Sequence, residues 1–210
     1  MEKNHWNGKK WYAYGTSMTS IKQGKYVPVV CELSGLKVTN YGIPGGCLTP
    51  DGYGKGDVKR AVMNMEDGKG EADLITLEVL PNEGATVGSI YDTDDESFCG
   101  CFNQAIRYLQ ENTKAQIVVI IMIGSNDKIP GTLSEVRHIP VFEFAETIER
   151  VARLNGVPVI NVFMEAGFGY ARVKARDYQK DTIHLNELGG KNMGRFVWSK
   201  LKDIPLWDTE

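Results

Sequence analysis

The chain has 210 residues, of which 42% are hydrophobic and 24% charged, and this composition argues against disorder and fits one folded domain spanning residues 1–210. The net charge of −3 provides no electrostatic attraction for a nucleic acid or an anionic membrane, so neither is expected as a partner. No apolar run approaches the length of a membrane span, and the opening residues MEKNHWNGKK lack the apolar core of a signal peptide, which leaves the location open between the cytoplasm and a larger or processed protein.

In the first half of the chain, short apolar runs alternate with segments of helical periodicity. In chain order we expect a strand over residues 11–15, a helix over 26–35, a strand over 36–42, a helix over 57–65 and a strand over 72–80. The first helix has its expected apolar stripe at Tyr26, Val29, Val30 and Leu33, and it ends at Gly35. The run over 72–80 is almost continuously apolar, which is typical of a strand covered on both faces.

The second half of the chain repeats the alternation. Ser97 is expected to cap an amphipathic helix that extends past Leu109. We then expect a strand over 115–124, a helix over 140–156, a strand over 157–164 and a last helix that begins near Asn186.

Five strands with intervening helices predict a parallel sheet with right-handed crossovers, in a three-layer α/β/α sandwich. In such sheets ligands bind beyond the carboxyl ends of the strands. Three short segments are expected at this edge: Gly15-Thr16-Ser17, the glycine-rich stretch 42–46, and Pro81-Asn82-Glu83.

A second group of candidate residues lies near the end of the chain. Asp181 comes three residues before His184, just ahead of the last expected helix. This spacing lets a carboxylate hold one imidazole nitrogen while the other faces a nucleophile. Ser17 would then be the nucleophile and His184 its general base. Ser17 alone would more often be a turn cap, and the combination with the Asp-His pair favours the catalytic interpretation.

These segments resemble those of the SGNH (GDSL-type) hydrolases. Members of that family carry a Gly-Asp-Ser block, a glycine block, a Gly-x-Asn-Asp block and a C-terminal Asp-x-x-His, in that order. This chain reads YGTS, NYGIPGG, VLPNE and DTIH in the same order. The resemblance covers essentially the whole chain and implies the family's flavodoxin-like fold.

The resemblance also implies roles for individual residues. Ser17 would attack an ester carbonyl, with Asp181 and His184 completing a catalytic triad. The oxyanion hole would consist of the backbone N–H groups of Ser17 and Gly45 and the side-chain amide of Asn82, with Gly46 as the alternative glycine. The family implies acetyl or other short acyl esters, often on carbohydrate, with lipid esters and thioesters also seen. It implies no metal and no organic cofactor.

The chain departs from the family pattern in two blocks. Thr16 stands in place of the Asp of the first block, and the third block reads Leu80-Pro81-Asn82-Glu83. A literal Gly-x-Asn-Asp match, GSND at 124–127, follows the fourth expected strand and makes Asn126 the alternative oxyanion donor. We favour Asn82, because position at the sheet edge decides the role.

Other features of the sequence are expected to have no part in a site. Cys31, Cys47, Cys99 and Cys101 lack the spacing of a zinc site, so we expect four reduced thiols. The acidic run over 92–97 lacks the pattern of a calcium loop and is expected to be solvated. Two other functions stay open: an inactive glycan-binding module of a larger phage-tail or cell-surface protein, and, more weakly, an acyltransferase.

Overall fold

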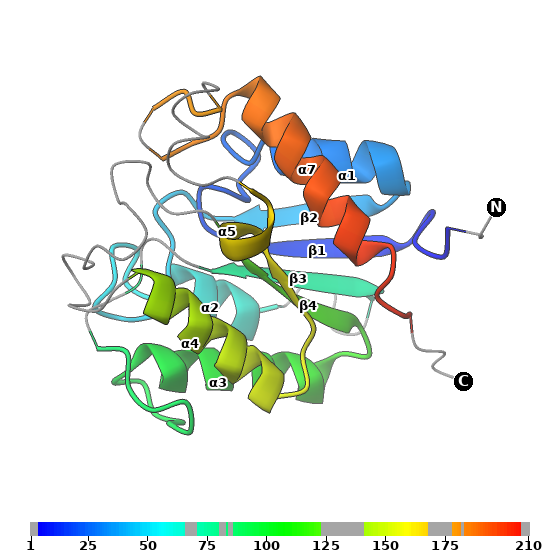
Figure 1. Ribbon diagram of the computed structural model, residues 1–210. Helices are drawn as coiled ribbons and strands as arrows, with labels where there is room; N and C mark the ends of the chain where they lie inside the picture. Colours follow the sequence, from blue (N-terminus) through cyan, green and yellow to red (C-terminus); the bar gives the residue numbers. More distant parts are fainter. Residues whose placement is uncertain are drawn as a thin grey trace.

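The computed structural model describes residues 4–65, 71–79, 83, 86–122, 141–167, 178–181 and 183–206. Within them the chain forms three layers, with one sheet between two layers of helices (Figure 1). Helices α1 (Tyr26–Ser34) and α7 (Glu187–Leu201) cover one face of the sheet, and α2 (Asp57–Met63), α3 (Phe98–Asn112) and α4 (Val141–Leu154) cover the other. The predicted α/β/α sandwich with a five-stranded parallel sheet is therefore confirmed.

The sheet has the order β2-β1-β3-β4-β5, and all its strand pairs are parallel. Its strands are β1 (Lys10–Gly15), β2 (Lys37–Gly42), β3 (Leu74–Val79), β4 (Gln116–Ile121) and β5 (Val159–Asn161). Every residue of β3 is buried, as expected of a central strand with helices on both faces.

The strand order changes direction at β1, which pairs with β2 on one side and β3 on the other. The chain leaves β1 toward one edge of the sheet and returns across it to begin β3. In open parallel sheets, ligands bind at the carboxyl ends of the strands beside such a switch point. The turn that carries Ser17 begins there, directly after Gly15.

Two expected helix starts are confirmed by their caps. The Ser97 side chain accepts a hydrogen bond from the N–H of Gly100, and the Asn186 side chain accepts one from the N–H of Gly189. Among the described residues, no helix is both long and apolar enough to cross a membrane.

The expected strand over 157–164 is wrong in its second half. Only Val159–Asn161 forms β5, and the chain then turns into the short helix α5 (Val162–Glu165). The reason is local, because the Asn161 side chain accepts the N–H of Met164 at 3.0 Å and so caps a helix. An apolar segment suits a buried strand and a buried helix equally, so its composition does not distinguish β5 from α5.

The expected apolar stripe of α1 is also partly wrong. Leu33 is 40% exposed, whereas Val27 and Ser34 are buried. Ser34 tolerates burial because its hydroxyl accepts the N–H of Leu36 at 3.0 Å, at the turn into β2. Gly35 has φ 74°, the left-handed conformation expected at the end of this helix.

Helices α1 and α7 pack closely because glycines of α7 face α1. A Cβ added to Gly194 would lie 2.5 Å from the Cβ of Val29, and one added to Gly190 would overlap Lys25. Only residues without a side chain allow this approach. It brings the segment ahead of α7, which holds Asp181 and His184, beside the turn ahead of α1, which holds Ser17.

Candidate active site

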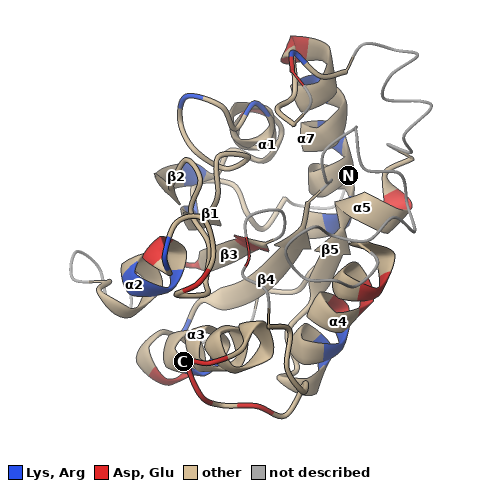
Figure 2. Cartoon of the chain, turned by 90° about the vertical axis from the view of Figure 1, so that its left-hand side faces the viewer, with Lys and Arg blue, Asp and Glu red and all other residues tan. Residues whose placement is uncertain are grey.

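The site lies at the carboxyl edge of the sheet, onto which Figure 2 looks, with α1 and α7 on one side and α3 and α4 on the other. Its first part is the serine turn, residues 15–20, which follows β1. The N–H groups of Thr19 and Ser20 both donate to the carbonyl of Thr16 at 3.1 Å, so the chain reverses tightly around Ser17. Ser17 itself is buried, with 6% of its surface exposed, and the turn holds it in a fixed position.

The second part is a tight loop ahead of α7, closed by a bridge between Gln179 and Leu185. The carboxylate of Asp181 organises this loop from within. Its Oδ1 accepts the N–H groups of Ile183 at 2.8 Å and of His184 at 2.6 Å. The Asp-x-x-His spacing is thus a turn in which the acid holds both the backbone and the imidazole.

The structure brings the three predicted triad residues together from opposite ends of the chain. His184 Nε2 lies 3.0 Å from Ser17 Oγ, and His184 Nδ1 lies 2.9 Å from Asp181 Oδ2. Both distances are hydrogen bonds of ordinary length. With Nδ1–H donating to the carboxylate, Nε2 is left to accept the hydroxyl proton of Ser17, which is the arrangement required for general-base activation of a serine.

The carboxylate of Asp181 stays ionised in this arrangement. Burial opposes its ionisation, but hydrogen bonds from the backbone N–H and imidazole of His184 and from the N–H of Ile183 lower its pKa to about 2. A carboxylate that remains charged can stabilise the imidazolium formed when His184 takes a proton.

In the glycine block after β2, backbone hydrogen bonding distinguishes the two candidate oxyanion glycines. The N–H of Gly46 donates to the carbonyl of Ile43 at 2.8 Å and is occupied. Over the described ranges, the N–H groups of Gly45 and Ser17 have no hydrogen-bond partner and can bind a ligand oxygen. Gly45 has φ 74°, a conformation that favours glycine. Asn82 and Asn126 both lie outside the described residues.

Glu83 connects the segment after β3 to the segment that follows Gly45. Its carboxyl oxygens accept the N–H of Leu48 at 3.0 Å, and one of them accepts the N–H of Thr49 at 3.2 Å. The side chain is 2% exposed. The residue that departs from Asp in the third block therefore has a structural use, because it ties two site loops together.

Glu78 is the residue of this region that the sequence analysis missed. It lies on β3, is fully buried, and accepts hydrogen bonds from Thr16 and Thr19 on either side of Ser17. Burial raises its pKa to about 7, although those hydrogen bonds lower it. The available signal was an acidic residue in the middle of the apolar run over 74–80.

The free energy of unfolding is expected to fall as rising pH ionises Glu78 in the folded protein. Its folded pKa of about 7 lies above the ordinary value of 4.5, so its stabilising contribution is complete below pH 4.5 and is lost as the pH passes 7. The difference corresponds to about 3 kcal/mol. Urea unfolding should therefore show Glu78→Gln gaining about that amount relative to the wild type over this pH range.

Asp181 does not affect the comparison of the wild type with Glu78→Gln, because it is present in both proteins and its pKa of about 2 lies below the pH range measured. A difference in unfolding free energy that stays constant between the two pH limits would contradict the assignment.

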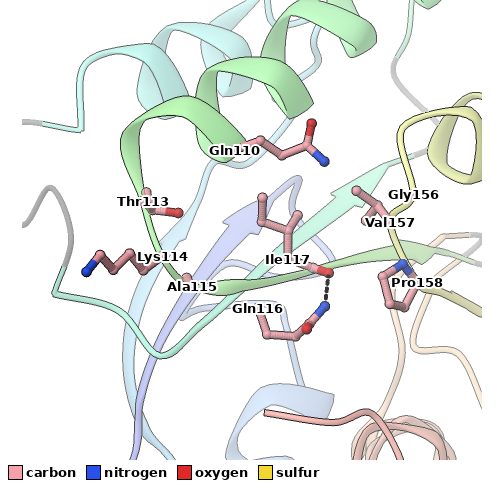
Figure 3. Close-up of a pocket in the computed structure, with 9 residues that line it drawn as sticks. All are labelled: Gln110, Thr113, Lys114, Ala115, Gln116, Ile117, Gly156, Val157 and Pro158. Carbon is pink, nitrogen blue, oxygen red and sulfur yellow. Dashed lines mark hydrogen bonds between the residues drawn. The ribbon is translucent and has the colours of Figure 1, made fainter. Parts of the chain in front are cut away.

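The described residues contain no group of three or more metal-ligating side chains. The four cysteines are free, as expected, and three of them are buried. A cavity of about 200 Å³ lies at the other end of the sheet, where β4 and β5 begin (Figure 3). Its lining includes Lys114, Gln116 and Pro158 but no nucleophile paired with a base, so it does not compete with the triad as an active site.

The parallel sheet with its switch point beside β1 defines an α/β fold, and the Ser-His-Asp chain at its carboxyl edge is the candidate active site. No family model and no curated protein sequence matches the chain. Solved structures do match it over nearly its whole length.

Three of these structures show the kind of protein that shares the fold. A possible lipase from Chitinophaga pinensis is 17% identical, with a TM-score of 0.69 over 95% of this chain and 100% of that one. A member of the lipolytic G-D-S-L family from Veillonella parvula is 16% identical, with a TM-score of 0.63 over 93% and 99%. An acetylxylan esterase from Geobacillus stearothermophilus is 11% identical, with a TM-score of 0.61 over 99% and 100%. The resemblance to SGNH (GDSL-type) hydrolases is thus confirmed at the level of the fold.

Proposed function

We propose that the chain is a serine esterase that hydrolyses acetyl or other short acyl esters through an acyl-Ser17 intermediate. The observation that carries the proposal is the hydrogen-bonded chain from Ser17 Oγ through His184 to Asp181, with distances of 3.0 and 2.9 Å. A serine that faces a base, which in turn is oriented by an ionised acid, is the arrangement that makes a hydroxyl nucleophilic near neutral pH.

The first half of the proposed reaction transfers the acyl group to Ser17. As Ser17 Oγ attacks the ester carbonyl carbon, its proton passes to His184 Nε2, and Asp181 stabilises the resulting imidazolium. The carbonyl oxygen becomes an oxyanion and accepts hydrogen bonds from the N–H groups of Ser17 and Gly45 and from the Asn82 amide. Collapse of this intermediate breaks the ester C–O bond, and His184 returns the proton to the leaving alcohol.

The second half releases the acid. A water molecule gives its proton to His184 and attacks the acyl-Ser17 carbonyl, with the same donors binding the oxyanion. Collapse expels Ser17 Oγ, which recovers its proton from His184. Each step uses side chains at the carboxyl edge, backbone N–H groups and water.

The acyl group is proposed to be short and the alcohol part a carbohydrate, because one structural neighbour is an acetylxylan esterase. The test compares initial rates of hydrolysis of p-nitrophenyl acetate, butyrate and octanoate, and then of acetylated xylo-oligosaccharides. Rates that fall as the acyl chain lengthens support the proposal, and the highest rate on octanoate contradicts it. Hydrolysis no faster than that of Ser17→Ala would favour a non-catalytic glycan-binding module.

The third oxyanion donor is tested by replacing each of the two candidate asparagines with alanine in turn. Asn82→Ala is expected to lower kcat for p-nitrophenyl acetate by about 10² to 10³, because one preorganised donor to the oxyanion is lost. Asn126→Ala is the matched control and should leave kcat within about threefold, since the proposal gives Asn126 no contact with the oxyanion. If Asn126→Ala shows the larger loss, the fourth-strand loop supplies the donor and the assignment to Asn82 is wrong.

A further inference from the structure

We propose that Glu78 is a positioning residue for Ser17: its buried carboxyl group, presented by β3, holds the serine turn so that the Ser17 hydroxyl meets His184. The proposal rests on the proposed function, because it assigns Glu78 a part in the use of Ser17 as the nucleophile. No step of the reaction passes through Glu78 itself.

The contacts of Glu78 lie on both sides of the nucleophile. The N–H of Thr16 donates to Oε2 at 2.6 Å, and the Thr16 hydroxyl lies 2.9 Å from Oε2 and 3.1 Å from Oε1. The Thr19 hydroxyl donates to Oε2 at 3.2 Å. Thr16 precedes Ser17 and Thr19 follows it by two positions, so one carboxyl group fixes the turn before and after the nucleophile.

The directions of these hydrogen bonds leave the carboxyl group as their common acceptor. Because the Thr19 hydroxyl donates to Glu78, it accepts from the Tyr26 hydroxyl, which lies 2.9 Å away at the start of α1. The Asn40 side chain donates to the Thr19 carbonyl at 2.7 Å from β2. The serine turn is thus held from β2, β3 and α1, and the contact with β3 is the one adjacent to Ser17.

The backbone is shaped to admit the carboxyl group. A Cβ on Gly15 would lie 2.5 Å from Glu78 Oε2 and 2.7 Å from the Thr19 hydroxyl. Glycine at this position therefore lets the end of β1 approach the carboxyl group without a clash. An apolar residue in place of Glu78 would leave the Thr16 N–H and two hydroxyls without their acceptor.

Burying the carboxyl group of Glu78 is unfavourable for folding, which favours a functional role for this residue. A fully buried carboxyl group is expensive to ionise, and over the described residues no Lys, Arg or His forms an ion pair with it. Burial raises its pKa to about 7, which is unfavourable for stability above that pH. Such a group beside a nucleophile is better explained by the geometry that it imposes than by stability.

The test measures kcat and KM for p-nitrophenyl acetate in Glu78→Ala and in a matched control, Thr76→Val. Thr76 is buried two residues earlier on the same face of β3 and accepts the indole N–H of Trp11 at 2.9 Å, away from the serine turn. Glu78→Ala is expected to lower kcat about 30- to 100-fold with KM within about threefold, because a shift of about 1 Å in a reacting group has effects of this size. Thr76→Val should lose stability but keep kcat within about twofold of the wild type.

Two further variants keep the proposal falsifiable if Glu78→Ala does not fold. Glu78→Gln keeps the length of the side chain, whereas Glu78→Asp keeps the carboxyl group but withdraws it from Thr16. Positioning predicts a higher kcat for Glu78→Gln than for Glu78→Asp. The reverse order, or a kcat for Glu78→Ala within twofold of the wild type or equal to that of Thr76→Val, overturns the proposal.

Crystal structures separate this proposal from the proposed function. If the wild type hydrolyses no ester, the function fails, but the distance between Ser17 Oγ and His184 Nε2 still reports on the turn. We expect the 3.0 Å hydrogen bond to be broken in Glu78→Ala and kept in Thr76→Val. An unchanged distance in both variants would show that Glu78 does not position Ser17.

Discussion

Replacing Ser17 with alanine is expected to lower kcat for p-nitrophenyl acetate by about 10⁴ or more. The hydroxyl of Ser17 lies 3.0 Å from His184 Nε2, and no acyl-enzyme can form without it. The residual rate should come from water activated in a site that still binds the substrate. Because the change removes one atom and leaves the backbone of the turn intact, the melting temperature should stay within a few degrees of that of the wild type.

Ser20→Ala is the matched control for this result. Ser20 belongs to the same turn and is buried, but its hydroxyl donates to the carbonyl of Ser17 at 3.0 Å rather than facing His184. We expect its kcat to stay within about threefold of the wild-type value, since only a local hydrogen bond is lost. Equal losses in both variants would show that integrity of the turn, and not a nucleophile, explains the effect.

Replacing Asp181 with asparagine is expected to lower kcat by about 10⁴ with little change in stability. The Asp181 Oδ1 atom accepts the N–H groups of Ile183 and His184, so an asparagine keeps its carbonyl oxygen there and turns its NH₂ group toward His184 Nδ1. The imidazole must then accept at Nδ1 and carry its proton on Nε2. A protonated Nε2 cannot take the proton of Ser17.

Glu187→Gln is a control with the same chemical change nearby. Glu187 pairs with Lys25 at 2.7 Å, and its side chain is 85% exposed. An exposed pair of this kind contributes little, so kcat should stay within about twofold of the wild-type value. The rates are measured under saturating p-nitrophenyl acetate near neutral pH. A loss for Asp181→Asn below about tenfold would mean that the acid does not set the imidazole tautomer.

Much of the fold could be predicted because long apolar runs and helix caps are local signals. The run over 72–80 and the cap at Ser97 lie where the structure has β3 and the start of α3. The end of the fifth strand was missed because Asn161 caps a helix through a side-chain contact that apolar periodicity does not reveal. The stripe of α1 was misassigned because that helix packs closely against α7, a contact that the periodicity of α1 alone does not reveal.

The triad could be proposed because its members lie in short segments whose order along the chain is informative. Glu78 and Glu83 could not be found in the same way, since their partners are backbone N–H groups and hydroxyls on loops far away in the sequence. The first block also carries Thr16 where the family resemblance implies an acid. In the structure, Glu78 on β3 brings a carboxyl group to that turn instead. Only the three-dimensional arrangement reveals this contact.

Whether Ser17 is a nucleophile activated by His184 can be measured by mass spectrometry after reaction with a fluorophosphonate. We expect one adduct per chain, located on the peptide that contains Ser17. It should form in the wild type and in Ser20→Ala, form much more slowly in Asp181→Asn, and be absent from Ser17→Ala. A wild-type chain that takes no adduct, or one that takes it on another residue, would show that Ser17 is not an activated nucleophile.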